Sequence, residues 1–263
     1  MPSEDTLSDA AYCAALARSD DRDRYLAAQF APPRERARLL ALLAVNAEIA
    51  RIPSAAREPL LAEMRFKWWH DAVMAALARH PQDSPPRPDR GAMEYARQDS
   101  PPRQPALAAF ARAAGESGLS ADRLAGPFER LIVARMRDIG AKPPRGEGEA
   151  VARAEATSGA IVEAALVLIG VADEAALRAA RAAGIAHALA ETAGAAEDPI
   201  RALIREHVAR ARADMARVPR SALPVLLWAT AAETRARRPA PGRPGSSPWL
   251  PLRLAWRAWR GRY

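Results

Sequence analysis

The segment "VNAEIARIPSAAREPLLAEMRFKWWHDAV", from Val45 to Val73, carries the clearest structural signal in the chain. Before Pro53, apolar residues recur at Val45, Ile49 and Ile52, and after it a broad apolar stripe runs through two tryptophans. Spacings of three and four place side chains on one face of a helix, and proline lacks the N–H that a helix interior requires. The segment therefore predicts two helices joined by a kink at Pro53.

The rest of the chain repeats this pattern of helices separated by proline, glycine or capping residues. Alanine, the best helix former, dominates the apolar set, and no segment alternates apolar and polar residues as a strand does. The fold class is therefore predicted to be all-α. Residues 1–237 are expected to form one helical domain with a proline-rich, disordered insert at 81–105, followed by a basic tail at 238–263. The predicted helices cover 7–30 with a restart at 19–21, 34–52, 59–80, 106–114, 120–139, 147–169, 173–193, 199–217 and 219–237.

The net charge of +8 is distributed unevenly along the chain. Residues 1–234 carry 31 cations and 31 acids, whereas eight arginines and no acid follow Thr234. The helical body thus has no basic surplus with which to hold a phosphate backbone, and we expect no nucleic-acid partner. Cys13 is the only cysteine, which excludes an internal disulfide. The acidic N-terminus predicts no signal peptide, and no apolar run approaches the roughly 18 residues of a spanning helix.

The sequence lacks GxSxG, GxxxxGK(S/T) and GxGxxG, so a triad hydrolase, a P-loop protein and a Rossmann fold have no support. The four histidines form no close ligand pair, and they are interpreted as ordinary core or surface residues. Acids such as Asp21, Asp23 and Asp198 stand at helix starts, where they stabilise the helix dipole. From the residues alone, these acids are therefore interpreted as caps.

Four segments together resemble the squalene/phytoene synthase family, in the branch related to mitochondrial complex I assembly factor 6. They are "DRDRYLAAQFAPPRERARLLALLAVNAEIA", "EPLLAEMRFKWWHDAV", "ATSGAIVEAALVLIG" and "RLAWRAWRGRY". The resemblance spans most of the chain from Asp21 to Tyr263 and leaves out the proline-rich insert. It implies an isoprenoid synthase-type helical bundle around a central cavity. Active members join two prenyl diphosphates head to head, using Mg²⁺ held by two aspartate-rich motifs.

Carried over by position, both motifs are degenerate in this sequence. The first falls on Asn46, Glu48, Ala50, Arg51 and Ser54. The second falls on Gly194, Ala195 and Pro199. The resemblance also makes Trp68, Asp138, Ser158 and Gly159 candidates for lining the cavity. With ligands missing at both motifs, we predict no catalytic residue, no metal-binding residue and no cofactor; Mg²⁺ is expected only if the protein is an enzyme after all.

Three functions remain open. The first is a non-catalytic assembly or binding scaffold, cytoplasmic and peripheral at the inner membrane, with a membrane surface or a membrane protein as partner. The second is a head-to-head prenyl transferase, and the third is a non-catalytic carrier of an isoprenoid or lipid ligand. Converging carboxylates in the cavity would favour the enzyme, an open apolar cavity the carrier, and a filled cavity the scaffold.

The C-terminal tail suggests a contact surface. If it is helical, Leu252, Trp256, Trp259 and Tyr263 form one stripe, beside a second stripe of arginines. Tryptophan next to arginine is typical of helices that lie in a membrane interface. Docking of the tryptophans on the helical body is an equally good interpretation. The residues predicted to contact a membrane or partner are Trp249, Arg253, Trp256, Arg257, Trp259 and Arg260.

Overall fold

The computed structural model is built from helices, with no strand in the residues it describes, which are 4–55, 58–78, 104–117, 122–140, 144–191, 198–237 and 247–263. The helices are α1 (Glu4–Asp20), α2 (Arg22–Ala28), α3 (Pro33–Ala55), α4 (Pro59–Ala78), α6 (Pro105–Glu116), α7 (Asp122–Met136), α8 (Glu147–Ala154), α9 (Ala160–Leu168), α10 (Glu174–Glu191), α11 (Asp198–Ala213), α12 (Leu223–Ala236) and α13 (Leu250–Trp259). A π-helical turn, η1 (Glu155–Gly159), joins α8 to α9, and a short 3-10 turn, η2 (Arg220–Ala222), precedes α12. The predicted insert at 81–105 lies almost wholly outside the described residues.

Local sequence signals explain where most helices begin. The predicted restart at 19–21 is confirmed, because the Asp21 side chain accepts a hydrogen bond from the Arg24 backbone N–H at 3.2 Å and caps α2. The helix predicted to end at Ile52 continues three residues further, through Pro53 to Ala55. A proline in the last turn removes one hydrogen bond but leaves few further turns to disrupt.

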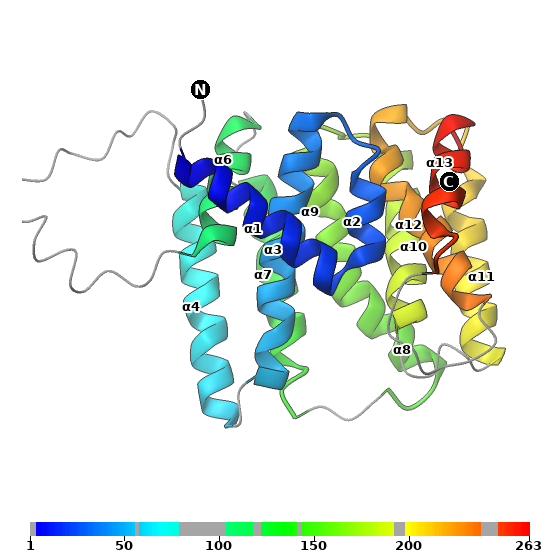
Figure 1. The fold of residues 1–263 in the computed structure, drawn as a ribbon. Coiled ribbons are helices and arrows are strands. Elements are labelled where there is room, and N and C mark those ends of the chain that lie inside the picture. Colours follow the sequence, from blue (N-terminus) through cyan, green and yellow to red (C-terminus); the bar gives the residue numbers. More distant parts are fainter. Residues whose placement is uncertain are drawn as a thin grey trace, which may run out of the picture.

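The helices pack in two connected groups around α3 and α10 (Figure 1). Helix α3 contacts α1, α4, α6 and α9, while α10 contacts α11, α12 and α9. Fully buried Phe66, Phe110 and Phe128 lie in the core of the first group, and the Phe110 and Phe128 ring centroids are 4.8 Å apart. Small residues let the two groups approach: a Cβ on Gly184 of α10 would stand only 2.7 Å from Val162 Cγ2 of α9.

The C-terminal helix is part of this body. Helix α13 packs against α12 and α2 and lies beside them in Figure 1. Leu250, Leu254 and Tyr263 are buried in that contact. Within the predicted tail, the residues from 250 onward therefore pack on the helical body.

Candidate functional site

The first degenerate motif lies at the end of α3 and is occupied by an ion pair. The Arg51 guanidinium pairs with the Asp20 carboxylate of α1, and this hydrogen bond raises the pKa of Arg51. The Ser54 hydroxyl donates a hydrogen bond to the Arg51 carbonyl oxygen at 3.0 Å. The Ala50 side chain has no atom that could bind a metal. Mg²⁺ requires several oxygen ligands, so these residues do not fit it.

The other two residues of this motif are also poor candidates for metal binding. Glu48 accepts a hydrogen bond from the Tyr12 hydroxyl at 2.5 Å, which raises the pKa of Tyr12 to about 12. Asn46 is buried, and its Oδ1 makes no hydrogen bond within the described residues. A single amide oxygen and one engaged carboxylate do not make a metal cluster.

The second degenerate motif offers no ligand either. Gly194 and Ala195 lie outside the described residues, and Pro199 is exposed in the first turn of α11. None of these three residue types carries a side-chain oxygen or nitrogen ligand. The side chains at these three positions therefore do not fit a metal ion.

A polar cluster that was not predicted from the sequence lies between α2, η1, α10 and α12, and it is buried except for the partly exposed Glu191 and Arg235 side chains. We call it the arginine–carboxylate cluster, and its members are Asp21, Asp23, Arg24, Ser158, His187, Glu191, Trp228 and Arg235. Burying charges is costly unless they are paired and hydrogen-bonded. The partners of each member therefore decide what the cluster can do.

Arg24 is the cluster's central cation. Its Nη1 donates to Asp21 Oδ2 at 2.7 Å, and its Nη2 donates to Ser158 Oγ at 3.2 Å. The guanidinium also lies over the Trp228 ring, 4.6 Å from the centroid. Burial alone would lower the pKa of Arg24, but the carboxylates of Asp21 and Glu191 outweigh it and raise the pKa. Arg24 therefore stays charged inside the protein.

A second ion pair, between Arg235 and Asp23, links α12 to α2. Arg235 Nη2 donates to Asp23 Oδ2 at 2.7 Å, and Arg235 Nε donates to the same oxygen at 3.2 Å. Asp23 does lie in the first turn of α2 as predicted, but its carboxylate is also buried and paired, which was not predicted. Burial would lower the pKa of Arg235, but Asp23 raises it.

His187 and Glu191 complete the cluster from one face of α10. His187 is 0% exposed; its Nε2 lies 4.0 Å from Asp23 Oδ2 and its Nδ1 3.5 Å from Glu191 Oε2. Burial would raise the pKa of Glu191, but the neighbouring His187 and Arg24 lower it well below its usual range. The carboxylate of Glu191 is therefore ionised near neutral pH.

These residues include one group with the spacing of metal ligands. One ligand atom each from Asp21, His187 and Glu191 lie within 4.8 Å of one another. The set mixes oxygen and nitrogen donors, whereas Mg²⁺ prefers oxygen alone. Because Asp21 already binds the Arg24 guanidinium, an entering metal would lie beside a fixed positive charge. The cluster does not fit Mg²⁺.

The residues predicted to line a cavity are dispersed. Asp138 pairs with Arg153 at 2.9 Å and lies at a pocket of about 260 Å³ between α7 and α8. Ser158 belongs to the buried cluster, whereas Trp68 is partly exposed and packs edge-on against Trp69 at 5.2 Å. Gly159 lines a larger pocket of about 550 Å³.

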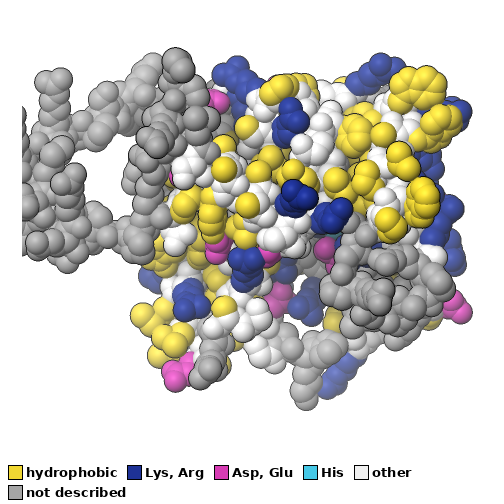
Figure 2. Space-filling model, viewed as in Figure 1, with side chains coloured by type: hydrophobic (Ala, Val, Ile, Leu, Met, Phe, Trp, Pro, Cys, Tyr) yellow, Lys and Arg dark blue, Asp and Glu magenta, His cyan; other side chains and the backbone are white. Residues whose placement is uncertain are grey.

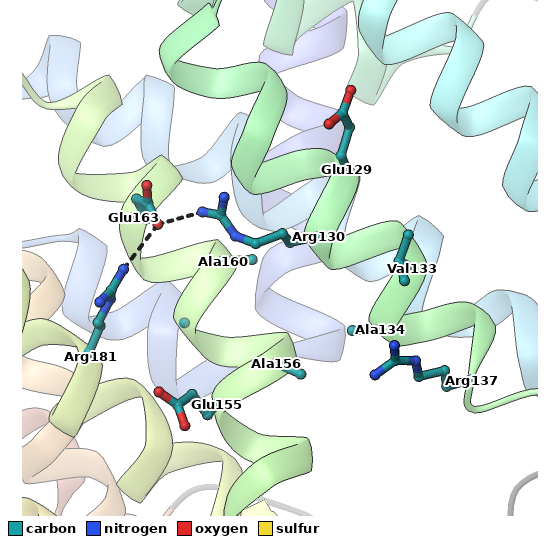
Figure 3. A pocket seen from close by; sticks show the side chains of 11 residues that line it. Glu129, Arg130, Val133, Ala134, Arg137, Glu155, Ala156, Ala160, Glu163 and Arg181 are labelled. Carbon is teal, nitrogen blue, oxygen red and sulfur yellow. Dashed lines mark hydrogen bonds and ion pairs between the residues drawn. The ribbon is translucent and has the colours of Figure 1, made fainter.

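That larger pocket lies between α7, the η1–α9 helix and α10 (Figure 3). Its floor is formed by alanine and glycine, and its rim carries Glu129, Arg130, Arg137, Glu155, Glu163 and Arg181. Arg130 and Arg181 both reach the Glu163 carboxylate, at 2.6 Å and 3.4 Å (Figure 3). Six charged side chains around a lining of mostly small residues do not match an apolar prenyl chain.

The C-terminal helix divides the residues that were predicted as one contact surface. Trp249, Leu252, Trp256 and Trp259 are exposed, but Tyr263 is buried instead of continuing their stripe. Arg257 is turned toward the body, 3.7 Å from Glu233, whereas Arg260 is exposed. In the described part of the chain, no helix is both long and apolar enough to cross a membrane.

Comparison with known proteins assigns this helical bundle to a family. The model of the family described as squalene/phytoene synthase matches residues 17–195, and the chain belongs to that family. A crystal structure of squalene synthase HpnC from Alicyclobacillus acidocaldarius is similar, with 16% identity and a TM-score of 0.61 over 99% of this chain and 97% of that one. A dehydrosqualene synthase in complex with a ligand matches with 11% identity and a TM-score of 0.61, covering 97% and 96%. No curated protein sequence matches the chain. The predicted all-α, isoprenoid synthase-type fold is confirmed.

Proposed function

We propose that this protein is a non-catalytic member of the squalene/phytoene synthase family that works as a binding or assembly scaffold at a membrane surface. The proposal rests on one observation: arginines pair with the carboxylates at the first degenerate motif and in the arginine–carboxylate cluster. Arg51 pairs with Asp20, Arg24 with Asp21 and Arg235 with Asp23. These positive charges are covalently attached to the protein, so they cannot be exchanged for metal ions bound to a substrate.

The chemistry explains why this pairing matters. Removing diphosphate from an allylic substrate leaves a carbocation and a highly charged leaving group. Divalent metals stabilise such a leaving group by several kcal/mol, and they must reach its oxygens directly. Ala50, Arg51 and Ser54 provide no carboxylate to bind such a metal. Arg51 also puts a cation where another cation would have to bind.

The head-to-head prenyl transferase is the second candidate, and a specific observation keeps it in view. The carboxylates of Asp21, Asp23 and the partly exposed Glu191 do converge on the buried His187. Convergence of this kind was the sign expected of an enzyme. The scaffold is favoured because Arg24 and Arg235 already neutralise two of the three carboxylates.

The lipid carrier is the weakest candidate of the three. The described pocket of about 550 Å³ has a rim of six charged side chains, and Val133 is its one large aliphatic residue. An isoprenoid ligand would bury its chain against mainly apolar walls. Filling of the interior by the arginine–carboxylate cluster also favours the scaffold.

The biological setting of the scaffold follows from the sequence resemblance. The segments that resemble complex I assembly factor 6 suggest a role in assembling a respiratory membrane complex, from the cytoplasmic face of the inner membrane. A membrane surface or a membrane protein is then the partner, and nucleic acid is not. No cofactor is needed for this role.

Turnover with the family's substrates tests the proposal. Purified protein with Mg²⁺ and farnesyl or geranylgeranyl diphosphate is expected to release no more diphosphate than a heat-denatured control. Metal-dependent release that disappears in Asp21→Asn and Glu191→Gln variants would show an active enzyme. In cells, deleting the gene should lower the amount of assembled complex, and the same two variants, if folded, should restore it.

A further inference from the structure

Helix α13 is fixed to the body by one of its faces. Leu250 and Leu254 are buried against α12 and α2, and Arg212 donates a hydrogen bond to the Tyr263 carbonyl oxygen. Arg257 lies 3.7 Å from Glu233 of α12. Since these contacts hold both ends of the helix, the direction of its opposite face is fixed as well.

That opposite face is apolar and exposed. We call it the tryptophan face; its members Trp249, Leu252, Trp256 and Trp259 are 67%, 63%, 53% and 77% exposed. The Trp256 and Trp259 rings are 5.6 Å apart, and the Arg260 guanidinium lies 4.1 Å over Trp256. Figure 2 shows hydrophobic side chains gathered over α13, with basic side chains beside them. Large apolar side chains clustered on a soluble surface indicate a binding site.

The charges around this face are positive, although fewer are available than the sequence suggested. Of the eight arginines after Thr234, Arg235, Arg237 and Arg257 make ion pairs with acids of the body. Three further arginines lie in α13 or directly after it and have no ion pair within the described residues; they are Arg253, Arg260 and Arg262. No acid occurs anywhere after Thr234 to neutralise them.

We propose that the tryptophan face docks on an anionic lipid bilayer, with α13 lying in the plane of the interface. Indole rings favour the boundary between headgroups and acyl chains, and arginines beside them attract anionic lipid. A protein surface would also accept aromatic residues, but arginines free of acids complement a continuous negative surface best. This inference names the partner of the proposed scaffold and in that respect rests on the proposed function.

Flotation of the full-length protein with lipid vesicles tests the docking. Wild type should bind phosphatidylcholine vesicles that contain phosphatidylserine, and should bind pure phosphatidylcholine much more weakly. Replacing Arg253, Arg260 and Arg262 by Gln should weaken binding about fivefold for each arginine, and so roughly 100-fold in total. This variant should also flatten the dependence on salt, since exposed charges are screened over about 8 Å at physiological ionic strength.

The tryptophans are tested separately. The double variant Trp256→Ala/Trp259→Ala should bind roughly tenfold or more weakly, with an unchanged salt slope, because it removes apolar area and no charge. A matched control, Leu60→Ala/Met64→Ala, removes two exposed apolar side chains from α4 and should bind as wild type does. All variants should keep the wild-type melting temperature, since none alters a side chain that is buried.

Several results would overturn the docking. Equal binding of wild type to neutral and anionic vesicles would do so, as would unchanged binding by both the arginine and the tryptophan variants. Binding to native membranes that fails on protein-free vesicles would assign the tryptophan face to a membrane protein instead. The diphosphate-release assay needs no vesicles, so loss of lipid binding and the discovery of turnover are separate outcomes.

Discussion

Replacing Arg24 by Met should destabilise the protein more than any exposed charge substitution would. The guanidinium side chain is only 6% exposed and that of its partner Asp21 only 9%. Removing one member of a buried ion pair typically costs about 3–5 kcal/mol, because the other charge is left uncompensated. Methionine keeps most of the apolar stem, so the loss reports mainly on the guanidinium. We expect urea unfolding of Arg24→Met to show a loss within that range.

Two further variants identify the cause of this loss. Asp21→Asn keeps the cap of α2, because Asn and Asp cap helices about equally well, but it removes the negative charge. The double variant Arg24→Met/Asp21→Asn should therefore lose less free energy of unfolding than the two single variants lose together. The difference should be about 1–3 kcal/mol. Arg51→Met breaks a largely exposed pair and should cost about 0–1 kcal/mol. A loss below about 1 kcal/mol for Arg24→Met, or strictly additive losses, would refute the assignment of Arg24 as the cluster's structural cation.

Three other expectations follow from the same structure. Neither Mg²⁺ nor a chelator should shift the melting temperature. A folded-state metal site would instead add about 2.7 kcal/mol to the free energy of unfolding at a metal concentration 100 times the dissociation constant, and would raise the melting temperature by several degrees. The pKa of Glu191 is lowered in the folded state, so its stabilising contribution is present above the unfolded value of about 4.3 and is lost as the pH falls below it. Acid titration of Glu191→Gln should thus show a shallower loss of stability below that pH than wild type, and an identical slope would contradict this. Burial raises the pKa of Cys13 to about 12, so a thiol reagent at pH 8 should label it only after unfolding, and rapid labelling of the native protein would disagree.

The helical fold was predictable because its signals are local. Apolar spacing, prolines and the Asp21 cap lie within a few residues of the elements they define, and they placed the helix boundaries closely. The π turn at Glu155–Gly159 was missed, since its sequence continues the helical pattern on both sides. A single inserted residue shifts the register of a helix without changing its composition.

The arginine–carboxylate cluster was not predictable by the same means. Its pairs join Asp23 to Arg235 and Arg24 to Ser158, across 212 and 134 residues of sequence. Nothing near Asp23 distinguishes a buried carboxylate from a surface helix cap, because burial depends on α10 and α12, which come much later in the chain. The tail posed the same problem: composition showed tryptophans and arginines, but only packing shows which of them face outward.

The pairing of two of the three carboxylates in the cluster with arginines is the reason for proposing a scaffold rather than an enzyme. A metal-dependent site keeps an excess of carboxylates, so that divalent ions enter with the substrate and leave with the diphosphate. Here Asp21, Asp23 and Glu191 face Arg24 and Arg235, with the imidazole of His187 between them. Arginine can itself bind phosphate oxygens, but Arg24 is buried and already bound to Asp21 and Ser158. A diphosphate would have to break both contacts and leave the Asp21 carboxylate buried without a cation. The pairing of Arg24 with Asp21 and Ser158 therefore supports the proposed non-catalytic role.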